Sequence, residues 1–183
     1  SEIYTNLAVK NEDDNKDVVF FKRLFQHYLD PNIRSEILKK LFFKYVTDNE
    51  KEFSNKLYLS LDNIKEMSKY GMEFGNHTYN HKWLEKLNNV EQIEEIENCL
   101  DFLQSTINNF SFDNWSIAYP YGSYNKSTLD LCKERGCAIG FTTEVNLSRL
   151  DVTNSLTLER LDTNHIPKDS NSPPNKWTTK IFD

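Results

Sequence analysis

The chain has 183 residues, 38% of them hydrophobic and 27% charged, so we expect a packed core rather than wholesale disorder. Its 22 basic and 28 acidic residues give a net charge of −6, which argues against a nucleic-acid partner bound through a basic surface. No apolar run approaches the roughly 18 residues that cross a bilayer, so no membrane span is predicted.

Three cysteines, Cys99, Cys132 and Cys137, form no CxxC pair. They predict neither a disulfide framework nor a thiolate zinc site, and they favour a reducing, cytoplasmic location. The first residue is Ser1 rather than Met, which leaves a signal peptide upstream open.

The first half of the chain predicts a strand at 3–9 and a loop at 10–17, followed by an amphipathic helix at 18–29. Pro31 interrupts this helix, and the same period resumes at 34–46. Ser60 is a candidate cap for a further helix at 61–70, with Gly71 at its end.

The second half continues the alternation of strands and helices. In chain order it predicts a short strand at 72–75, a long helix at 90–107, a strand at 115–119, a helix at 127–135, and strands at 137–142 and 156–161. Such an order indicates an α/β fold, a mainly parallel sheet with outer helices. A complete eight-stranded barrel takes about 250 residues, so this chain is too short for one. We expect one domain over 1–166 and a polar, extended tail at 167–183.

Two histidines stand four positions apart in the stretch GMEFGNHTYNH, residues 71–81. If a helix begins at 76–78, the imidazoles of His77 and His81 project from one face within reach of a single cation. They follow a predicted strand, where α/β folds place their active sites. Neutral imidazole suits zinc, and also cobalt or nickel, but a catalytic zinc usually has three protein ligands. Coincidental spacing of two half-exposed histidines stays open as the alternative.

A second stretch, residues 116–124, runs from an apolar strand into the turn Pro-Tyr-Gly. Pro120 fixes φ and Gly122 permits a close approach, so the backbone N–H of Tyr121 could face a cleft. A rigid N–H of this kind is what an oxyanion hole requires. The alternative is an ordinary turn that ends a strand.

Together, a strand followed by Gly-x-x-x-Gly-Asn-His-Thr-x-x-His and a later strand ending in Pro-Tyr-Gly resemble the polysaccharide deacetylase family (NodB homology, carbohydrate esterase family 4). The resemblance covers residues 59–140 and, more loosely, 160–167. It implies a deformed (β/α) barrel and a divalent metal, zinc before cobalt or nickel, held by one Asp and two His. His77 and His81 would be the imidazole ligands, and the Tyr121 N–H would stabilise the oxyanion. Gly122 and Tyr124 would lie beside an acetylated carbohydrate.

The chain departs from the family pattern in three places. It has no Thr-Phe-Asp-Asp-Gly motif, which supplies both family aspartates, and we read Asp13-Asp14 as a solvated loop instead. Ala118 stands where the family has an arginine. The Leu-x-His of the family's general acid has no clear counterpart; the loose candidates, for which a structural role is the alternative, are Arg160, Asp162 and His165.

We therefore expect the domain to be N-terminally incomplete, with an incomplete metal site and weak or no activity. The intact protein is expected to remove acetyl groups from an N- or O-acetylated sugar or polysaccharide. Two alternatives remain: a catalytically dead carbohydrate-binding or scaffolding module of the same fold, and a hydrolase of a non-sugar amide. A barrel lacking a strand has an unpaired edge, which leaves a homo-oligomer open.

Overall fold

The computed structural model describes residues 2–9, 14–149, 155–169 and 171–182. The chain divides into two compact units, Ser1–Leu59 and Ser60–Asp183. Within the described residues, no helix is both long and apolar enough to cross a membrane.

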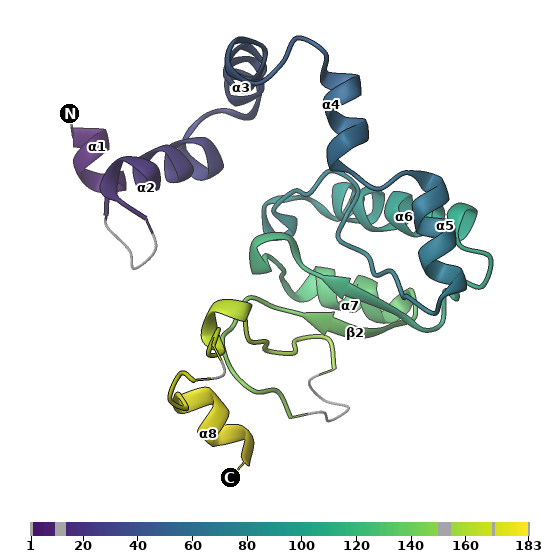
Figure 1. The fold of residues 1–183 in the computed structure, drawn as a ribbon. Helices are drawn as coiled ribbons and strands as arrows, with labels where there is room; N and C mark the ends of the chain where they lie inside the picture. Colours follow the sequence, from purple (N-terminus) through teal and green to yellow (C-terminus); the bar gives the residue numbers. More distant parts are fainter. Residues whose placement is uncertain (1, 10–13, 150–154, 170, 183) are drawn as a thin grey trace. The chain divides into compact units, whose positions relative to one another are not determined.

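The described part of the first unit consists of helices (Figure 1). They are α1 (Glu2–Leu7), α2 (Lys16–Arg23), a π-helical continuation η1 (Leu24–Tyr28), α3 (Pro31–Tyr45) and α4 (Glu50–Leu57). The Asp30 side chain accepts from the N–H groups of Asn32 and Ile33, which caps α3, and Pro31 occupies the first turn, where its missing N–H costs nothing. The two predicted helices at 18–29 and 34–46 are thereby confirmed, while α4 was not anticipated.

The predicted strand at 3–9 is wrong, because this segment forms α1 and a following turn. No strand occurs in the described residues of this unit, so an extended segment would have no partner for its backbone groups. As a helix it satisfies them internally, and the Ala8 N–H donates to the Tyr4 carbonyl at 2.8 Å. The Tyr4 ring also packs on Phe20 of α2, with centroids 4.9 Å apart.

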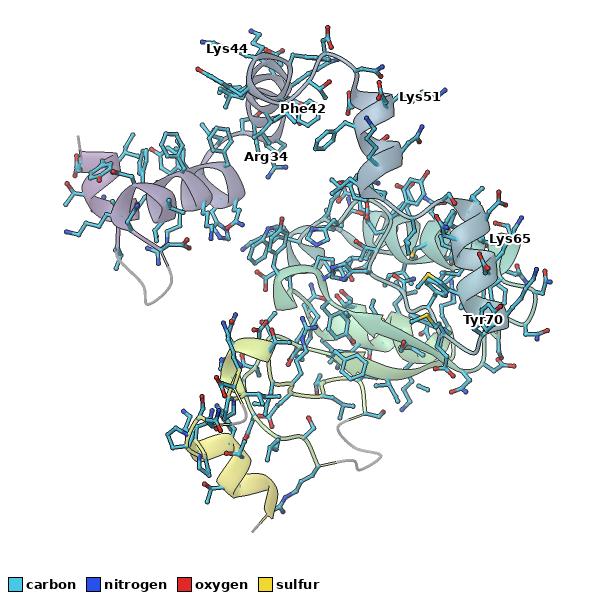
Figure 2. All side chains as sticks on the ribbon, viewed as in Figure 1. Arg34, Phe42, Lys44, Lys51, Lys65 and Tyr70 are labelled. Carbon is cyan, nitrogen blue, oxygen red and sulfur yellow. The ribbon has the colours of Figure 1, made fainter. Side chains whose placement is uncertain are left out.

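Aromatic rings also join α3 to α4. Phe42 of α3, labelled in Figure 2, meets Phe53 of α4 edge to face, with ring centroids 5.3 Å apart. Apart from such ring pairs, the only buried hydrophobic residues described in this unit are Ala8 and Val19. The unit therefore has a small core.

The second unit is α/β and contains a short parallel sheet. Its elements are α5 (Leu61–Lys69), η2 (Leu84–Lys86), α6 (Asn89–Thr106), β1 (Trp115–Ala118), η3 (Pro120–Gly122), α7 (Lys126–Glu134), β2 (Cys137–Phe141), η4 (Thr163–His165) and α8 (Lys176–Phe182). Ser60 caps α5, and Gly71 follows it at φ +83°. The predicted helices at 61–70, 90–107 and 127–135 and the strands at 115–119 and 137–142 are confirmed.

The sheet has β1 and β2 paired in parallel, with Ile117 opposite Gly140. A single parallel bridge on each side extends it, Asn76 to Ile117 and Phe141 to Leu158. The predicted strands at 72–75 and 156–161 are therefore wrong as strands, since the first segment is followed by a single bridge at Asn76 and the second contains a single bridge at Leu158. The spatial order is nevertheless parallel throughout, from Asn76 through β1 and β2 to Leu158.

The core of this unit is formed by residues of the sheet and of the helices α6 and α7, and Figure 1 shows α7 beside β2. Its buried members are Leu84, Ile96, Leu100, Trp115, Ile117, Tyr119, Leu131, Cys132 and Cys137. Within the predicted helix at 90–107, Ile96, Leu100, Leu103 and Ile107 are buried, whereas Val90 is exposed.

The sequence predicted an extended tail at 167–183, but α8 forms within this segment. The Asn175 side chain accepts from the N–H groups of Trp177 and Thr178 at 2.9 and 3.1 Å, and it donates to the His165 carbonyl at 2.7 Å. A capping asparagine thus starts this helix in a stretch whose composition indicates a coil.

Candidate functional site

The segment that carries His77 and His81 is an irregular loop and not the predicted helix. Thr78 and His81 have φ of 61° and 56°, which lie in the left-handed region. The Asn76 side chain accepts a hydrogen bond from the Thr78 N–H at 2.8 Å, and the Glu95 carbonyl accepts one from the Tyr79 N–H at 3.0 Å. The left-handed backbone at Thr78 and His81 interrupts a right-handed helical path, so no helix forms over this stretch.

Asn76 fixes the start of this loop. It is 1% exposed, and its backbone bridges β1 through Ser116 O at 2.7 Å and the Ala118 N–H at 3.0 Å. Its side-chain amide also donates to the Ile96 carbonyl of α6 at 3.0 Å. The loop therefore leaves the sheet edge from a residue that is bonded to both β1 and α6.

The loop still brings the two imidazoles together. The ring centroids of His77 and His81 lie 4.7 Å apart, with their planes at 73°. The Nδ1 of His77 lies 2.5 Å from the carbonyl oxygen of Ala118. A carbonyl only accepts, so Nδ1 must carry a proton, and in the neutral form of the ring Nε2 of His77 is then the nitrogen with a free lone pair.

Burial lowers the pKa of His81, and the neighbouring His77 lowers it further, while a backbone hydrogen bond partly opposes both effects. The His81 ring is therefore neutral at neutral pH. Neutral imidazole is the form that binds metal ions.

The Pro-Tyr-Gly turn lies directly beside this pair. Tyr121, at φ 57°, belongs to η3, and its ring meets His81 edge to face with centroids 4.8 Å apart. Its other neighbour is Trp83, whose ring stacks on it at 4.4 Å with planes 3° apart. Two stretches about 40 residues apart in the sequence thus form one aromatic cluster: His77, His81, Trp83 and Tyr121.

Gly122 has φ +71°, and a Cβ at this position would lie 2.2 Å from Oγ1 of Thr143. Its N–H donates to the Tyr119 carbonyl at 2.9 Å, and the Ser123 N–H donates to Pro120 O at 2.9 Å. Both space and backbone conformation therefore require glycine here. Tyr124 lies further along, half-buried, with its ring 4.9 Å from that of the core residue Tyr119.

The loose candidates near the C-terminus make local contacts. The Asp162 side chain accepts from the Asn164 N–H at 2.8 Å, a bond that lowers its pKa, and the Asp162 N–H donates to Nδ1 of His165 at 2.9 Å. Arg160 Nε donates to the Thr142 carbonyl at 2.8 Å. These bonds shape the chain around η4 and β2.

Of the two acidic residues in the N-terminal loop, Asp13 lies outside the described residues. Asp14 pairs with Lys22 at 2.6 Å.

Glu95 was missed by the sequence analysis, although it is only 2% exposed. Its carboxylate accepts from the backbone N–H of Asn80 at 2.7 Å and from the Asn80 side chain at 2.8 Å. Lys82 Nζ lies 3.3 Å from the same group. The one available signal was that Glu95 directly precedes the buried Ile96 in α6. A charged residue in a helix is normally expected to face solvent, so this signal was not used.

The two imidazoles suit zinc, cobalt or nickel by their chemistry. Among the described residues, however, no three His, Cys, Asp or Glu side chains come together as a metal cluster. His77 and His81 therefore fit two positions of a metal coordination shell.

Comparison with known proteins places this arrangement in a family. The sequence model of the polysaccharide deacetylase family matches residues 33–140. The chain belongs to the polysaccharide deacetylase family. The match begins at α3, upstream of residue 59, where the sequence resemblance began.

Two known proteins are similar to the chain. The Bacillus subtilis (strain 168) protein named "Putative polysaccharide deacetylase YxkH" is 30% identical over 101 residues, which are 55% of this chain and 35% of that protein. The structure of the Streptococcus pyogenes deacetylase PplD in complex with acetate matches with a TM-score of 0.51 and 34% identity, over 56% of this chain and 44% of that one. The chain spans about a third of the length of its curated relative.

Proposed function

We propose that the chain belongs to a metal-dependent hydrolase that removes acetyl groups from an N- or O-acetylated sugar or polysaccharide. The observation that carries the proposal is the contact of His77 and His81 with each other and of His81 with Tyr121. The family and the two relatives, both named as deacetylases, support the reaction class. The proposal includes the finer fold, an incomplete (β/α) barrel, for which the parallel order from Asn76 to Leu158 is the support.

In this proposal, His77 and His81 hold a divalent metal, preferably zinc, through their unprotonated nitrogens. Such a metal, when bound, lowers the pKa of a coordinated water to about 7 and polarises a carbonyl. His77 contributes with its ring fixed by Ala118, and His81 contributes as a neutral base. With two ligands on the described residues, we expect this chain by itself to bind metal weakly and to have low activity.

We assign substrate contacts to the Pro-Tyr-Gly turn. The Tyr121 N–H would donate to the oxygen that becomes negative as the acetyl carbonyl is attacked. Its left-handed backbone, between Pro120 and Gly122, is rigid, so this donor would need no reorganisation. In this proposal Gly122 and Tyr124 also lie beside the substrate; Gly122 lets the turn pass over the Thr143 side chain, and Tyr124 packs on the core residue Tyr119.

A carbohydrate-binding module without catalysis is the second candidate. The stack of Trp83 on Tyr121 favours it, because Tyr121 is 40% exposed. Exposed aromatic faces of this kind suit the apolar face of a sugar ring.

One experiment separates the two candidates. The chain and the variants His77→Ala and His81→Ala are titrated with Zn²⁺ and Co²⁺ by calorimetry and assayed for acetate release from N-acetylglucosamine oligomers. His27→Ala is the matched control, since His27 is an exposed histidine of the first unit. If the chain belongs to a hydrolase, both site variants should lose metal binding and any acetate release, while the control keeps them. If both variants still bind the N-acetylglucosamine oligomers and the parent chain binds no metal, the result would instead establish the binding module.

A further inference from the structure

Glu95 bonds to the residues on both sides of His81. Its Oε2 accepts the Asn80 N–H at 2.7 Å, and its Oε1 accepts the Asn80 side-chain amide at 2.8 Å and lies 3.3 Å from Lys82 Nζ. The carbonyl of the same residue accepts the Tyr79 N–H at 3.0 Å. One residue of α6 therefore holds positions 79, 80 and 82 of the histidine loop.

The chemistry of this contact requires a carboxylate. A carboxylate has two acceptor oxygens and no donor, so it can take the Asn80 backbone, the Asn80 amide and the Lys82 ammonium together. A glutamine would offer one acceptor and would turn an NH₂ toward a donor. Burial by itself raises the pKa of Glu95, but the hydrogen bonds from Asn80 and Lys82 outweigh it and the net pKa is lowered, so the group is ionised at neutral pH.

The two histidines are held in different ways. The His77 ring is fixed directly by its bond to the Ala118 carbonyl. The backbone of His81, at φ 56°, lies in a region that costs a side-chain-bearing residue free energy and persists only where the surroundings impose it. The bonds from Asn80 and Lys82 to Glu95 supply that constraint on either side of His81.

We propose that Glu95 is a positioning residue that holds the His81 imidazole beside His77 in the geometry needed to share a metal ion. The inference rests on the proposed role of the two histidines as metal ligands. Glu95 acts through Asn80 and Lys82 and touches neither the metal nor the substrate. A loss of such outer contacts costs about 10- to 100-fold in metal affinity in other proteins.

The test compares Glu95→Gln and Asn80→Ala with Glu97→Gln in the full chain. Glu97 lies two residues further along α6, is 40% exposed at its side chain and pairs with Arg135 at 2.7 Å, so it is the matched control. Asn80 is exposed, and Asn80→Ala removes one bond to Glu95 without opening the core. We expect Co²⁺ affinity, measured by titration of the cobalt absorption bands, to fall at least tenfold in Glu95→Gln and several-fold in Asn80→Ala, with Glu97→Gln within twofold of the parent.

A second readout separates this inference from the proposed function. The ring protons of His81, followed by NMR without metal, report the ring contacts with His77 and Tyr121. They should shift in Glu95→Gln and Asn80→Ala and not in Glu97→Gln. If the parent chain binds no Co²⁺, the metal site fails, and these shifts alone decide whether Glu95 positions His81. Unchanged affinity and unchanged His81 resonances in both variants would overturn the inference.

Discussion

Gly122 lies where the Pro-Tyr-Gly turn packs against the side chain of Thr143. A methyl group there would meet the Thr143 side chain at 2.2 Å, and φ of +71° disfavours any side chain. Gly71 has a similar φ of +83°, but nothing lies within 4 Å of its missing Cβ. These two glycines therefore separate backbone strain from steric crowding.

We predict that Gly122→Ala lowers the free energy of unfolding by about 2–3 kcal/mol, because strain and crowding add. Gly71→Ala should cost about 1 kcal/mol, from strain alone. Urea denaturation followed by tryptophan fluorescence measures both changes. Equal losses in the two variants would show that Thr143 moves aside freely and that crowding contributes nothing.

At the level of single residues, the sequence indicated which side chains meet but not how. His77 and His81 were expected to converge because of helical spacing, yet Ala118 and Glu95 place them from distant parts of the chain. Such partners cannot be read from a local pattern, since they depend on which segments become neighbours in the fold. The buried Glu95 was invisible for the same reason.

Helix α6 is the element on which the histidine loop depends. It supplies the Ile96 carbonyl to Asn76 and the Glu95 carboxylate to Asn80. Its start is fixed by a capping box, in which the Asn88 side chain accepts the Glu91 N–H at 3.1 Å and the Glu91 side chain accepts the Asn88 N–H at 2.9 Å. The stability of this helix is thus coupled to the placement of the site.

We predict that Asn88→Ala destabilises the chain by about 1 kcal/mol, the typical cost of losing such a cap. Asn98→Ala, at an exposed position inside the same helix, should change stability by less than about 0.5 kcal/mol. Chemical denaturation of both variants provides the measurement. A loss in Asn98→Ala as large as that in Asn88→Ala would mean that the capping box is not what stabilises the start of α6.

Whole elements were predictable where a local signal defined them. The helices α5, α6 and α7 combine a cap with an apolar stripe, and the strands β1 and β2 are short, mainly apolar runs. The short segment at 3–9 lacked such a signal, because six or seven mixed residues suit a strand or a helix equally. Its outcome was decided by tertiary context, including the contact of Tyr4 with Phe20.

On the scale of the whole chain, the two units differ in their cores. The second unit contains the cluster around Ile96, Trp115 and Tyr119, whereas the described hydrophobic residues buried in the first are Ala8 and Val19. Because buried apolar area is the main stabilising contribution, the second unit should resist denaturation better. All three tryptophans of the chain, Trp83, Trp115 and Trp177, belong to this second unit.

We therefore predict two separate unfolding transitions. The far-ultraviolet circular dichroism signal of helix should begin to fall at a lower urea concentration than the fluorescence of the buried Trp115, because the helices of the first unit unfold first. A Trp177→Phe variant, which removes a tryptophan near the C-terminus, controls for local changes in α8. Coincident transitions by both probes would show that the two units unfold as one.

The left-handed backbone at Thr78, His81 and Tyr121 has a consequence for any molecule that arrives at the site. None of these residues is a glycine, so each conformation is imposed by the surrounding structure. A ligand that binds there meets a loop that is already ordered, so little conformational entropy of the loop is lost on binding. More of its contact energy is therefore retained as affinity than a pliable loop of the same composition would allow.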